Sequence, residues 1–287
     1  MLMKEKNSSS IMSPDIGKLA TEKPFAIGVP WLQTGWIDQH YIPKQTIQTK
    51  INCPKSRTTC VPLNLKIMEN PSKIIEDDIE YSLGDFDGNR VLYDFDKISI
   101  YLNAKGKLLF GDQFRIYDED KDIIHKLCYY FIKDQKNCQK YDIDPRKGIL
   151  LSGPVGCGKT TLMTLLRHII PTNRPYDIIP CRNVIFSFNH LGFKTVEDYG
   201  NTKSFCFDDL GIEPMGRFYG KDLNVMGEVL LSRYELFIQS KQRIKTHATT
   251  NLDADELEEH YGHRVRSRMR KLFNIIDFDE SAGDKRK

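Results

Sequence analysis

A glycine-rich stretch in the middle of the chain has the residue types and spacing of a phosphate-binding loop. In "GPVGCGKTT" (153–161), four residues separate Gly153 from Gly158, which Lys159 and Thr160 follow directly. Glycines let the backbone turn tightly and approach an anion, and amides at a helix start point toward negative charge. At this spacing the lysine reaches the β- and γ-phosphates of a nucleoside triphosphate, and the threonine hydroxyl can ligate Mg²⁺. The stretch therefore predicts a site for ATP and Mg²⁺.

Every residue of this loop is a candidate for nucleotide contact, with Cys157 expected as a small spacer. The residues are Gly153, Pro154, Val155, Gly156, Cys157, Gly158, Lys159, Thr160 and Thr161.

Two adjacent acids follow an apolar stretch about 45 residues further on, in "SFCFDDLGIEP" (204–214). We expect Asp208 to hold Mg²⁺ through water, and Asp209 to orient or deprotonate the attacking water. Many motors have Glu at the second position. Because Asp is one methylene shorter, slow hydrolysis is expected. The alternative is a pair of turn-forming aspartates.

A polar strand end supplies a third candidate in "RIKTHATTNLD" (243–253). An amide at the carboxyl end of a parallel strand lies beside the nucleotide crevice, where Asn251 can position water near the γ-phosphate. The same residue is equally suited to closing the strand or capping the next helix. Thr249 and Thr250 are weaker candidates.

An arginine-rich helix is predicted in "EHYGHRVRSRMRKLF" (259–273). Arg264 and Arg268 are four residues apart and share one helical face, and Arg266 and Arg270 form a second such pair. This pattern fits a solvated basic face. It also fits an arginine finger that completes the site of a neighbouring subunit. The expected buried face consists of Tyr261, Val265, Met269 and Leu272.

These side chains need strand ends and helix starts to position them. From residue 118 onward, strand and helix patterns alternate along the sequence and provide such positions. "DEDKDIIHKLCYYFIKDQ" has helical spacing, and apolar strand and helix patterns then alternate. Such alternation predicts an α/β fold with a mostly parallel sheet covered on both faces. The alternating stretches are "GILLSG", "TLMTLLRHII", "NVIFSF", "SFCFDD", "VMGEVLLSRYELFI", "IKTHATT" and "FNIIDF".

The sequence before residue 118 has a different character. Residues 1–23 are polar and predict a flexible tail. Prolines recur through much of 24–117, which predicts a small irregular or β-rich domain. Within it, "NRVLYDFDKISIYLNAKGKLLFG" (89–111) alternates apolar and polar residues around a Lys-Gly pair, and this favours strands. The predicted organisation is thus a tail, an N-terminal region and a nucleotide-binding domain at 118–287.

Composition excludes several classes of protein. The 287 residues carry a net charge of only +3, so contact with nucleic acid requires a local basic patch. The sequence contains no apolar run of about 18 residues, so it predicts no membrane span. The seven cysteines are expected to be reduced thiols in a cytoplasmic protein. Cys53 and Cys60 are too far apart for the usual zinc-ligand pair, so ordinary thiols are favoured over zinc.

Taken in order, these segments resemble an AAA+ ATPase, and within that group the DnaC-type helicase loaders and IstB-type transposition helpers. The resemblance covers about residues 118–280 and is carried by "GPVGCGKTT", "FDDLGIEP", "VLLSRYELF", "TTNL" and "YGHRVRSRMRKLFNIIDF". It implies a three-layer αβα P-loop NTPase of the AAA+ type without a C-terminal helical lid. It also implies that Asn251 is sensor 1 and that Arg264 is the arginine finger, with Arg268 beside it.

The resemblance further implies a partner and an assembly. We expect ATP hydrolysis, an ATP-dependent ring or spiral, and DNA binding, with single strands favoured over duplex. The expected protein partner is a replicative helicase or another replication or transposition protein, bound through 24–117. Two alternatives remain, a transposition helper on duplex DNA and an ATP-gated protein-binding adaptor.

One loop lies outside the family pattern. "GIEPMGRFYGKDLNVMGEVL" (211–230) offers charge and stacking surface for nucleic acid, although an ordinary surface loop is the alternative. The residues concerned are Arg217, Phe218, Tyr219 and Lys221.

Overall fold

The computed structural model describes residues 70–88, 90–169, 176–201, 203–279 and 281–286. Contacts divide the chain into two units, Met1–Leu63 and Asn64–Lys287, and every described element belongs to the second unit. The predicted tail and the cysteines at 53 and 60 lie outside the described residues.

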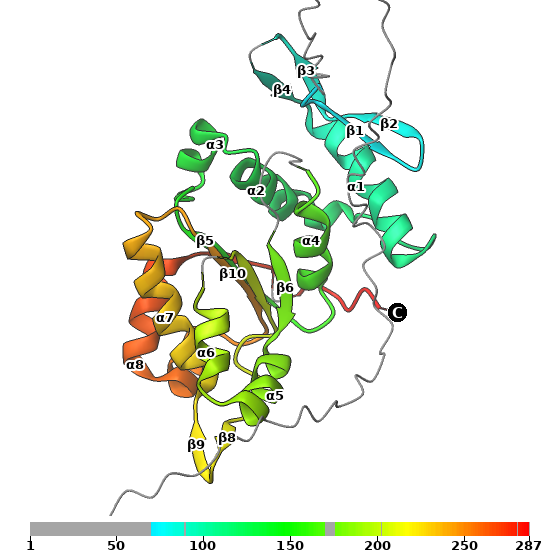
Figure 1. The fold of residues 1–287 in the computed structure, drawn as a ribbon. Coiled ribbons are helices and arrows are strands. Elements are labelled where there is room, and N and C mark those ends of the chain that lie inside the picture. Colours follow the sequence, from blue (N-terminus) through cyan, green and yellow to red (C-terminus); the bar gives the residue numbers. More distant parts are fainter. Residues whose placement is uncertain (1–69, 89, 170–175, 202, 280, 287) are drawn as a thin grey trace, which may run out of the picture. The chain divides into compact units, whose positions relative to one another are not determined.

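Five parallel strands form the central sheet, in the order β11-β5-β10-β7-β6 (Figure 1). Most residues of the three inner strands are buried, as expected for a parallel sheet covered on both faces. The strands are β5 (Gly148–Ser152), β6 (Asp177–Pro180), β7 (Phe205–Asp208), β10 (Thr246–Thr250) and β11 (Phe273–Asp277).

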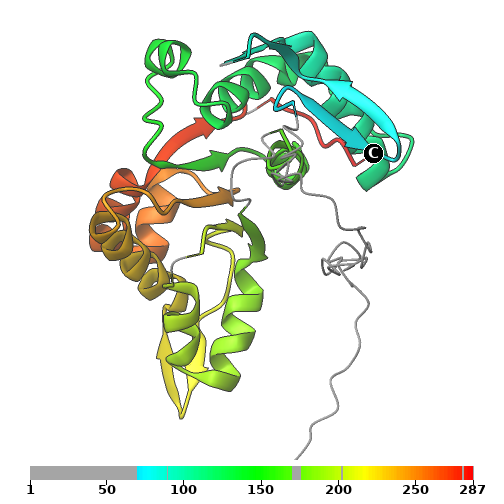
Figure 2. The same cartoon turned by 45° about the horizontal axis from the view of Figure 1, so that its top comes forward.

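Helices cover both faces of this sheet (Figure 2). Successive side chains of a strand point to opposite faces, so Ile149 and Leu151 of β5 belong to one core and Leu150 to the other. The first core includes residues of α1 (Phe95–Phe110), α2 (Lys121–Phe131), α3 (Gln135–Lys140) and α4 (Lys159–Leu166). The second involves α5 (Cys181–Leu191), α6 (Lys194–Tyr199), α7 (Val225–Gln239) and α8 (Ala254–Leu272).

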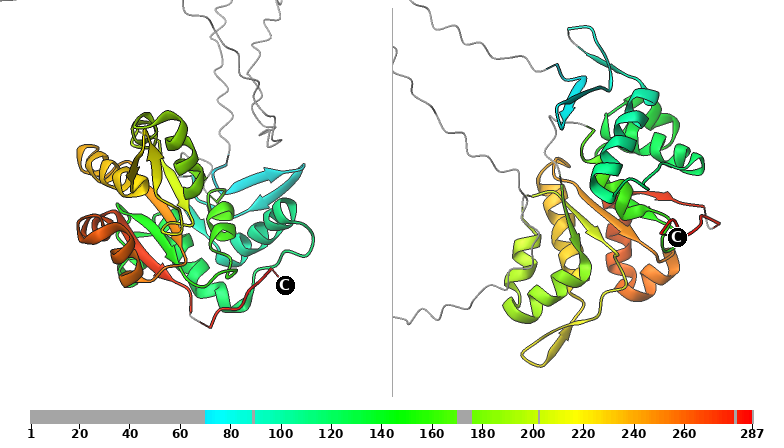
Figure 3. Two further views of the ribbon diagram at one scale, coloured as in Figure 1. Left: turned by 90° about the horizontal axis from the view of Figure 1, so that it is seen from below. Right: turned by 90° about the vertical axis from the view of Figure 1, so that its right-hand side faces the viewer.

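The predicted three-layer α/β fold is therefore confirmed. In the second layer, α7 and α8 lie side by side (Figure 3). No described helix is both long enough and apolar enough to cross a membrane.

Three small hairpins and a short turn of helix complete the described elements. The hairpins are antiparallel pairs. Their strands are β1 (Lys73–Glu76) with β2 (Ile79–Ser82), β3 (Gly84–Phe86) with β4 (Val91–Tyr93), and β8 (Gly216–Phe218) with β9 (Lys221–Leu223); the turn is η1 (Asp118–Asp120).

The strands predicted for 89–111 are wrong beyond β4, because Phe95–Phe110 is the helix α1. The Asp94 carboxylate caps it by accepting hydrogen bonds from the amides of Asp96 (2.9 Å) and Lys97 (3.3 Å). The buried residues Ile98, Tyr101 and Leu102 follow helical spacing. The strand pattern and the helix pattern share these apolar positions, and the cap decides between them.

The Lys-Gly pair is not a turn. Gly106 lies within α1, where an added Cβ would stand 2.0 Å from the ring of Phe114. This glycine therefore makes room for a ring rather than reversing the chain. Since α1 packs in the same core as α2 and α4, residues on both sides of the predicted boundary at 118 share that core.

One further stretch differs from its place in the predicted alternation. "NVIFSF" lies within α5, and the strand of this unit is the preceding β6. Val184, Ile185 and Phe188 are buried on one face of α5, at a spacing that fits a helix as well as a short strand.

Candidate nucleotide-binding site

The phosphate-loop residues lie between β5 and α4, as the motif requires. Gly156 and Gly158 have φ values of 85° and 102°, in the left-handed region that favours glycine. α4 begins at Lys159, so its first amides and those of the loop are available to an anion. The local geometry therefore fits a phosphate cradle.

Lys159 is folded back onto the loop. Its Nζ donates hydrogen bonds of 2.7 Å to the carbonyl oxygens of both Gly153 and Pro154, and only 5% of the residue is exposed. Burial lowers the pKa of its ammonium, while the charges of nearby acids, including Asp209, oppose that shift. Cys157 is buried beside it, as expected of a packed spacer.

The carboxyl ends of neighbouring strands bring the polar candidates together. β7 and β10 are paired so that Phe207 lies opposite Ala248, and this register sets Asp208 beside Thr249. Asp208 Oδ1 accepts hydrogen bonds from the hydroxyls of Thr160 (2.7 Å) and Thr249 (2.6 Å). Thr249, a weaker candidate from the sequence, therefore joins the two halves of the site through its hydroxyl.

This pair of oxygens fits Mg²⁺. A threonine hydroxyl and an aspartate carboxylate 2.7 Å apart are hard oxygen ligands, and Mg²⁺ binds through one or two such groups together with phosphates and waters. The described residues include no cluster of three or more His, Cys, Asp or Glu side chains suited to a metal. An ion held by Thr160 and Asp208 would thus depend on the nucleotide for further ligands.

Asp209 has a strained backbone and a perturbed carboxyl. Its φ is 57°, which is uncommon for a residue with a side chain and typically costs about 1–3 kcal/mol at functional sites. Its amide donates to Thr249 Oγ1 (3.0 Å), and its carboxylate accepts a long hydrogen bond of 3.4 Å from Asn251 Nδ2. Burial and then the charge of Asp208 raise the pKa of Asp209, and Lys159 and Asn251 oppose the shift.

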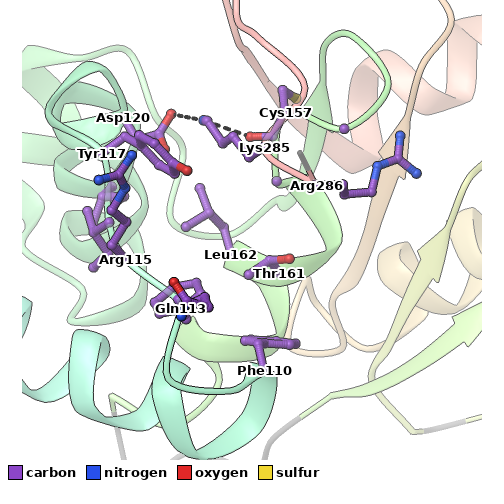
Figure 4. A pocket seen from close by; sticks show the side chains of 15 residues that line it. Phe110, Gln113, Arg115, Tyr117, Asp120, Cys157, Thr161, Leu162, Lys285 and Arg286 are labelled. Atoms are coloured by element: carbon purple, nitrogen blue, oxygen red, sulfur yellow. Dashed lines mark hydrogen bonds and ion pairs between the residues drawn. The ribbon is translucent and has the colours of Figure 1, made fainter.

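A pocket of about 310 Å³ opens beside the loop, on the side of α4 (Figure 4). Ligand pockets commonly have volumes of about 300–1,000 Å³, so this one could hold the nucleoside part of a nucleotide. It is mainly apolar, and the chain before α2 contributes nearly half of its lining residues. The lining residues include Phe110, Gln113, Phe114, Arg115, Ile116 and Tyr117.

A C-terminal segment (281–286) reaches the same pocket. The Lys285 ammonium forms an ion pair with Asp120 and donates to the carbonyl of Cys157 (2.9 Å), while its amide donates to the carbonyl of Gly156 (3.1 Å) (Figure 4). Burial raises the pKa of Asp120 and Lys285 opposes that rise. These residues could not be predicted from the sequence, because no local pattern links positions 165 residues apart.

The arginines of α8 do not join this cluster. Gly262 has non-helical angles (φ 79°, ψ 159°), so the arginine stretch forms a separate helical segment after a kink. Arg264 is exposed, and within the described part of the chain no hydrogen bond or ion pair is found for it. Arg268 instead lies over the ring of Tyr234, 5.0 Å from its centroid.

The other two arginines have partners on α8 itself. Arg266 is buried and donates from Nε to the carbonyl of Ala254 (3.3 Å), and Arg270 pairs with Glu258 (3.2 Å). The expected buried face of Tyr261, Val265, Met269 and Leu272 is confirmed.

The sheet, the glycine loop and the acids at the strand ends together define an α/β P-loop nucleotide-binding fold. No protein-family model matches the chain, and no curated protein matches it.

Solved structures with a similar fold include the DnaC helicase loader, at 17% identity and a TM-score of 0.42, covering 58% of this chain and 95% of that one. They also include AMPPCP-bound DnaA from Aquifex aeolicus, at 12% identity and a TM-score of 0.37, covering 58% of this chain and 48% of that one. These neighbours are too distant to carry conclusions about activity or partners.

Proposed function

We propose that this protein is an ATPase of the AAA+ type that acts in DNA replication as a helicase loader. The observation that carries the proposal is the hydrogen-bonded cluster at the strand ends. Beside the glycine loop, a chain of hydrogen bonds runs from Thr160 to Asp208, then to Thr249, Asp209 and Asn251. A phosphate loop alone indicates only binding, whereas this cluster has the groups needed to hold Mg²⁺ and orient water.

Each group then has a separate task. The loop amides and Lys159 bind the phosphates, and the pocket lined by 110–117 takes the nucleoside. Bound Mg²⁺ would neutralise charge on the phosphates, with Thr160 and Asp208 as its protein ligands. Asp209 would accept the proton of the attacking water, and Asn251 would hold that water or the Asp209 carboxylate in position.

The exposed Arg264 has a task only in an assembly. A guanidinium that has no partner among the described residues is free to enter the site of a second copy and stabilise charge on the transferred phosphoryl. We therefore propose an ATP-dependent ring or spiral in the cytoplasm that binds DNA, single strands in preference to duplex, and that delivers a replicative helicase bound through residues 24–117.

The test is DNA binding and hydrolysis by the full chain in defined nucleotide states. Labelled single-stranded and duplex DNA are titrated by anisotropy at a stated salt concentration, with ATP, ADP or no nucleotide. We expect ATP-dependent binding to single strands. Lys159→Ala should abolish binding and hydrolysis, while Asp209→Asn should bind ATP and DNA but hydrolyse about 100-fold more slowly.

Three other outcomes would redirect the assignment. ATP-dependent assembly on duplex would favour a transposition helper. No DNA binding in any nucleotide state would leave the ATP-gated adaptor, particularly where Lys159→Ala abolishes partner binding and Asp209→Asn does not. No ATP binding by the unaltered protein would contradict the whole proposal.

A further inference from the structure

The hairpin of β8 and β9 has an aromatic side chain at its tip. Tyr219 and Gly220 form the two-residue turn, with φ values of 48° and 75°, the pattern of a type I′ turn. Such turns favour Gly, which has no Cβ, and Asn or Asp, whose short polar side chains can hydrogen-bond locally at positive φ. Tyrosine at this position has a conformational cost, and 92% of the residue is exposed. Because the side chain is so exposed, packing within the described chain does not offset this conformational cost. The position of Tyr219 therefore points to a role in binding another molecule.

The base of the hairpin is fixed to α5, so its tip is held in place. The amide of Arg217 donates to the side chain of Asn189 (2.7 Å). The ring of Phe218 lies so close to Gly192 that an added Cβ would stand 2.4 Å from it. Within the Asn64–Lys287 unit, the hairpin projects beyond α5, on the side away from α2 and α4 (Figure 1).

Four aromatic rings continue from this tip onto the turn between α5 and α6, and we name them the aromatic row. Their centroids are 5.8 Å apart for Phe193 and Phe188, 5.9 Å for Phe188 and Phe218, and 4.5 Å for Phe218 and Tyr219. The inner two are packed, while the outer two, Phe193 and Tyr219, are 64% and 92% exposed. The row thus presents two exposed rings supported by the buried Phe188 and the half-buried Phe218.

Positive charge flanks the row. Lys221 lies opposite Phe218 in the hairpin register and is exposed, and it forms no ion pair with any residue that the structure describes. Arg217 is also exposed, with only a long contact of 3.6 Å to Asp222. Two cations beside exposed rings are complementary to a polyanion whose bases are unpaired.

We propose that the aromatic row, with Lys221 and Arg217, is a binding surface for single-stranded nucleic acid. Bases stack on Tyr219 and Phe193, and phosphates lie near the two cations. Single strands are favoured over duplex, because duplex bases are already stacked and expose no face to a ring. Stacking of this kind tolerates any sequence, which suits an assembly that holds DNA of arbitrary sequence. The inference rests on the DNA-binding part of the proposed function and adds where the strand is held.

The test uses the full chain with ATP and an oligonucleotide containing 2-aminopurine, whose emission falls when the base stacks on an aromatic ring. Tyr219→Ala should weaken single-strand binding about 10-fold and remove most of the quenching, and Tyr219→Phe should retain both. Phe186→Ala is the matched control. Phe186 is 56% exposed and lies on α5, the helix that carries Phe188, but outside the aromatic row. Lys221→Ala should reduce the slope of log affinity against log salt by about 0.7.

ATP affinity of each variant reports whether the fold is intact. Unchanged DNA affinity and quenching in Tyr219→Ala and in Phe193→Ala, with the unaltered protein binding DNA, would overturn the inference and leave the proposed function standing. Equal loss in Phe186→Ala would also overturn it, because the effect would not be specific to the row. Failure of the unaltered protein to bind single strands in any nucleotide state would refute both together.

Discussion

At the scale of single residues, the hydroxyl of Thr249 contacts both acids of the site. It donates to Asp208 and accepts from the amide of Asp209, so it positions both acids. We expect Thr249→Val to leave ATP affinity within about threefold while slowing hydrolysis about 10- to 100-fold. Leaving the part-buried Asp209 amide without an acceptor should also cost about 1 kcal/mol or more of stability.

The neighbouring Thr250 supplies the matched control. Its hydroxyl donates to the carbonyl of Leu210 (2.7 Å) and accepts from the amide of Leu252 (3.1 Å), without touching either acid. Thr250→Val should cost similar stability with little loss of hydrolysis, in single-turnover assays paired with urea unfolding. Equal slowing in the two variants would show that Thr249 matters for the strand rather than for the acids.

A second single residue explains a motif whose role the sequence left open. The arginine of "SRYE", Arg233, is 1% exposed, and its guanidinium donates to Thr246 Oγ1 and to the backbone carbonyls of Asn201, Lys203 and Lys245. These contacts join α7 to the start of β10 and to the chain before β7. This arginine therefore stabilises the sheet that positions the site and has no described contact with the nucleotide-binding residues.

At the scale of elements, the C-terminal segment forms one wall of the pocket beside the glycine loop through Lys285. Removing its ammonium would leave Asp120 as a buried carboxylate facing an anionic ligand, which disfavours binding. We expect Lys285→Ala to weaken ATP binding about 10-fold, or roughly 1.4 kcal/mol, by isothermal titration calorimetry.

A double variant separates the effect of the Lys285 charge on ATP affinity from the effect of its shape. Asp120→Asn together with Lys285→Ala should recover most of the lost affinity, because no unpaired charge then remains. If Lys285→Ala binds ATP more tightly than the unaltered protein, the segment obstructs the pocket rather than completing it.

The elements that could be predicted from the sequence are those whose signals are local. The glycine loop, β7 with its two acids, and the polar end of β10 each carry their pattern within about ten residues. The helix α1 was mistaken for strands because Gly106 was read as part of a turn, whereas its role, making room for the ring of Phe114, is tertiary. The pocket wall was missed for the same reason, since Asp120 and Lys285 meet only in the folded chain.

At the scale of the whole molecule, buried neutral histidines make stability depend on pH. His247 is 3% exposed, and its Nδ1 accepts a hydrogen bond from the amide of Ile149 (3.1 Å). Burial, followed by the charges of Lys245 and Arg233, lowers the pKa of His247 to about 3. Burial likewise lowers the pKa of His168 to about 4.

The sign of the dependence follows from these shifts. Below about pH 6.5 the unfolded histidine takes up a proton that the folded one does not, so stability is full above 6.5 and falls toward pH 3. At pH 5 the loss from His247 is roughly 2 kcal/mol. Urea unfolding at pH 7 and pH 5 should show His247→Asn losing less stability than the unaltered protein by about this amount. An identical pH dependence in both would contradict a neutral buried His247.

The proposed assembly would determine whether the site can turn over, because the catalytic candidate Arg264 forms no hydrogen bond or ion pair with any described residue. It lies in the first turn after the Gly262 kink, directed into solvent, while Arg266 and Arg270 are held by their own helix. If Arg264 acts on a neighbouring copy, Arg264→Ala should bind ATP normally and hydrolyse roughly 100-fold more slowly.

Mixing two inactive variants tests this directly. Asp209→Asn retains Arg264 and, by the proposal, still binds ATP, while Arg264→Ala retains an intact set of acids. In a mixed assembly, the arginine of the first variant faces the intact site of the second, so hydrolysis should rise well above that of either variant alone. Mixing either single variant with the double variant, in which both Arg264 and Asp209 are changed, should give no rise in hydrolysis. Arg270→Ala, which removes an exposed arginine of the same helix, should keep its activity. If no ratio of the two variants restores hydrolysis, Arg264 acts in the site of its own subunit or in no site. Hydrolysis in a ring or spiral would then not depend on Arg264 from a neighbouring copy.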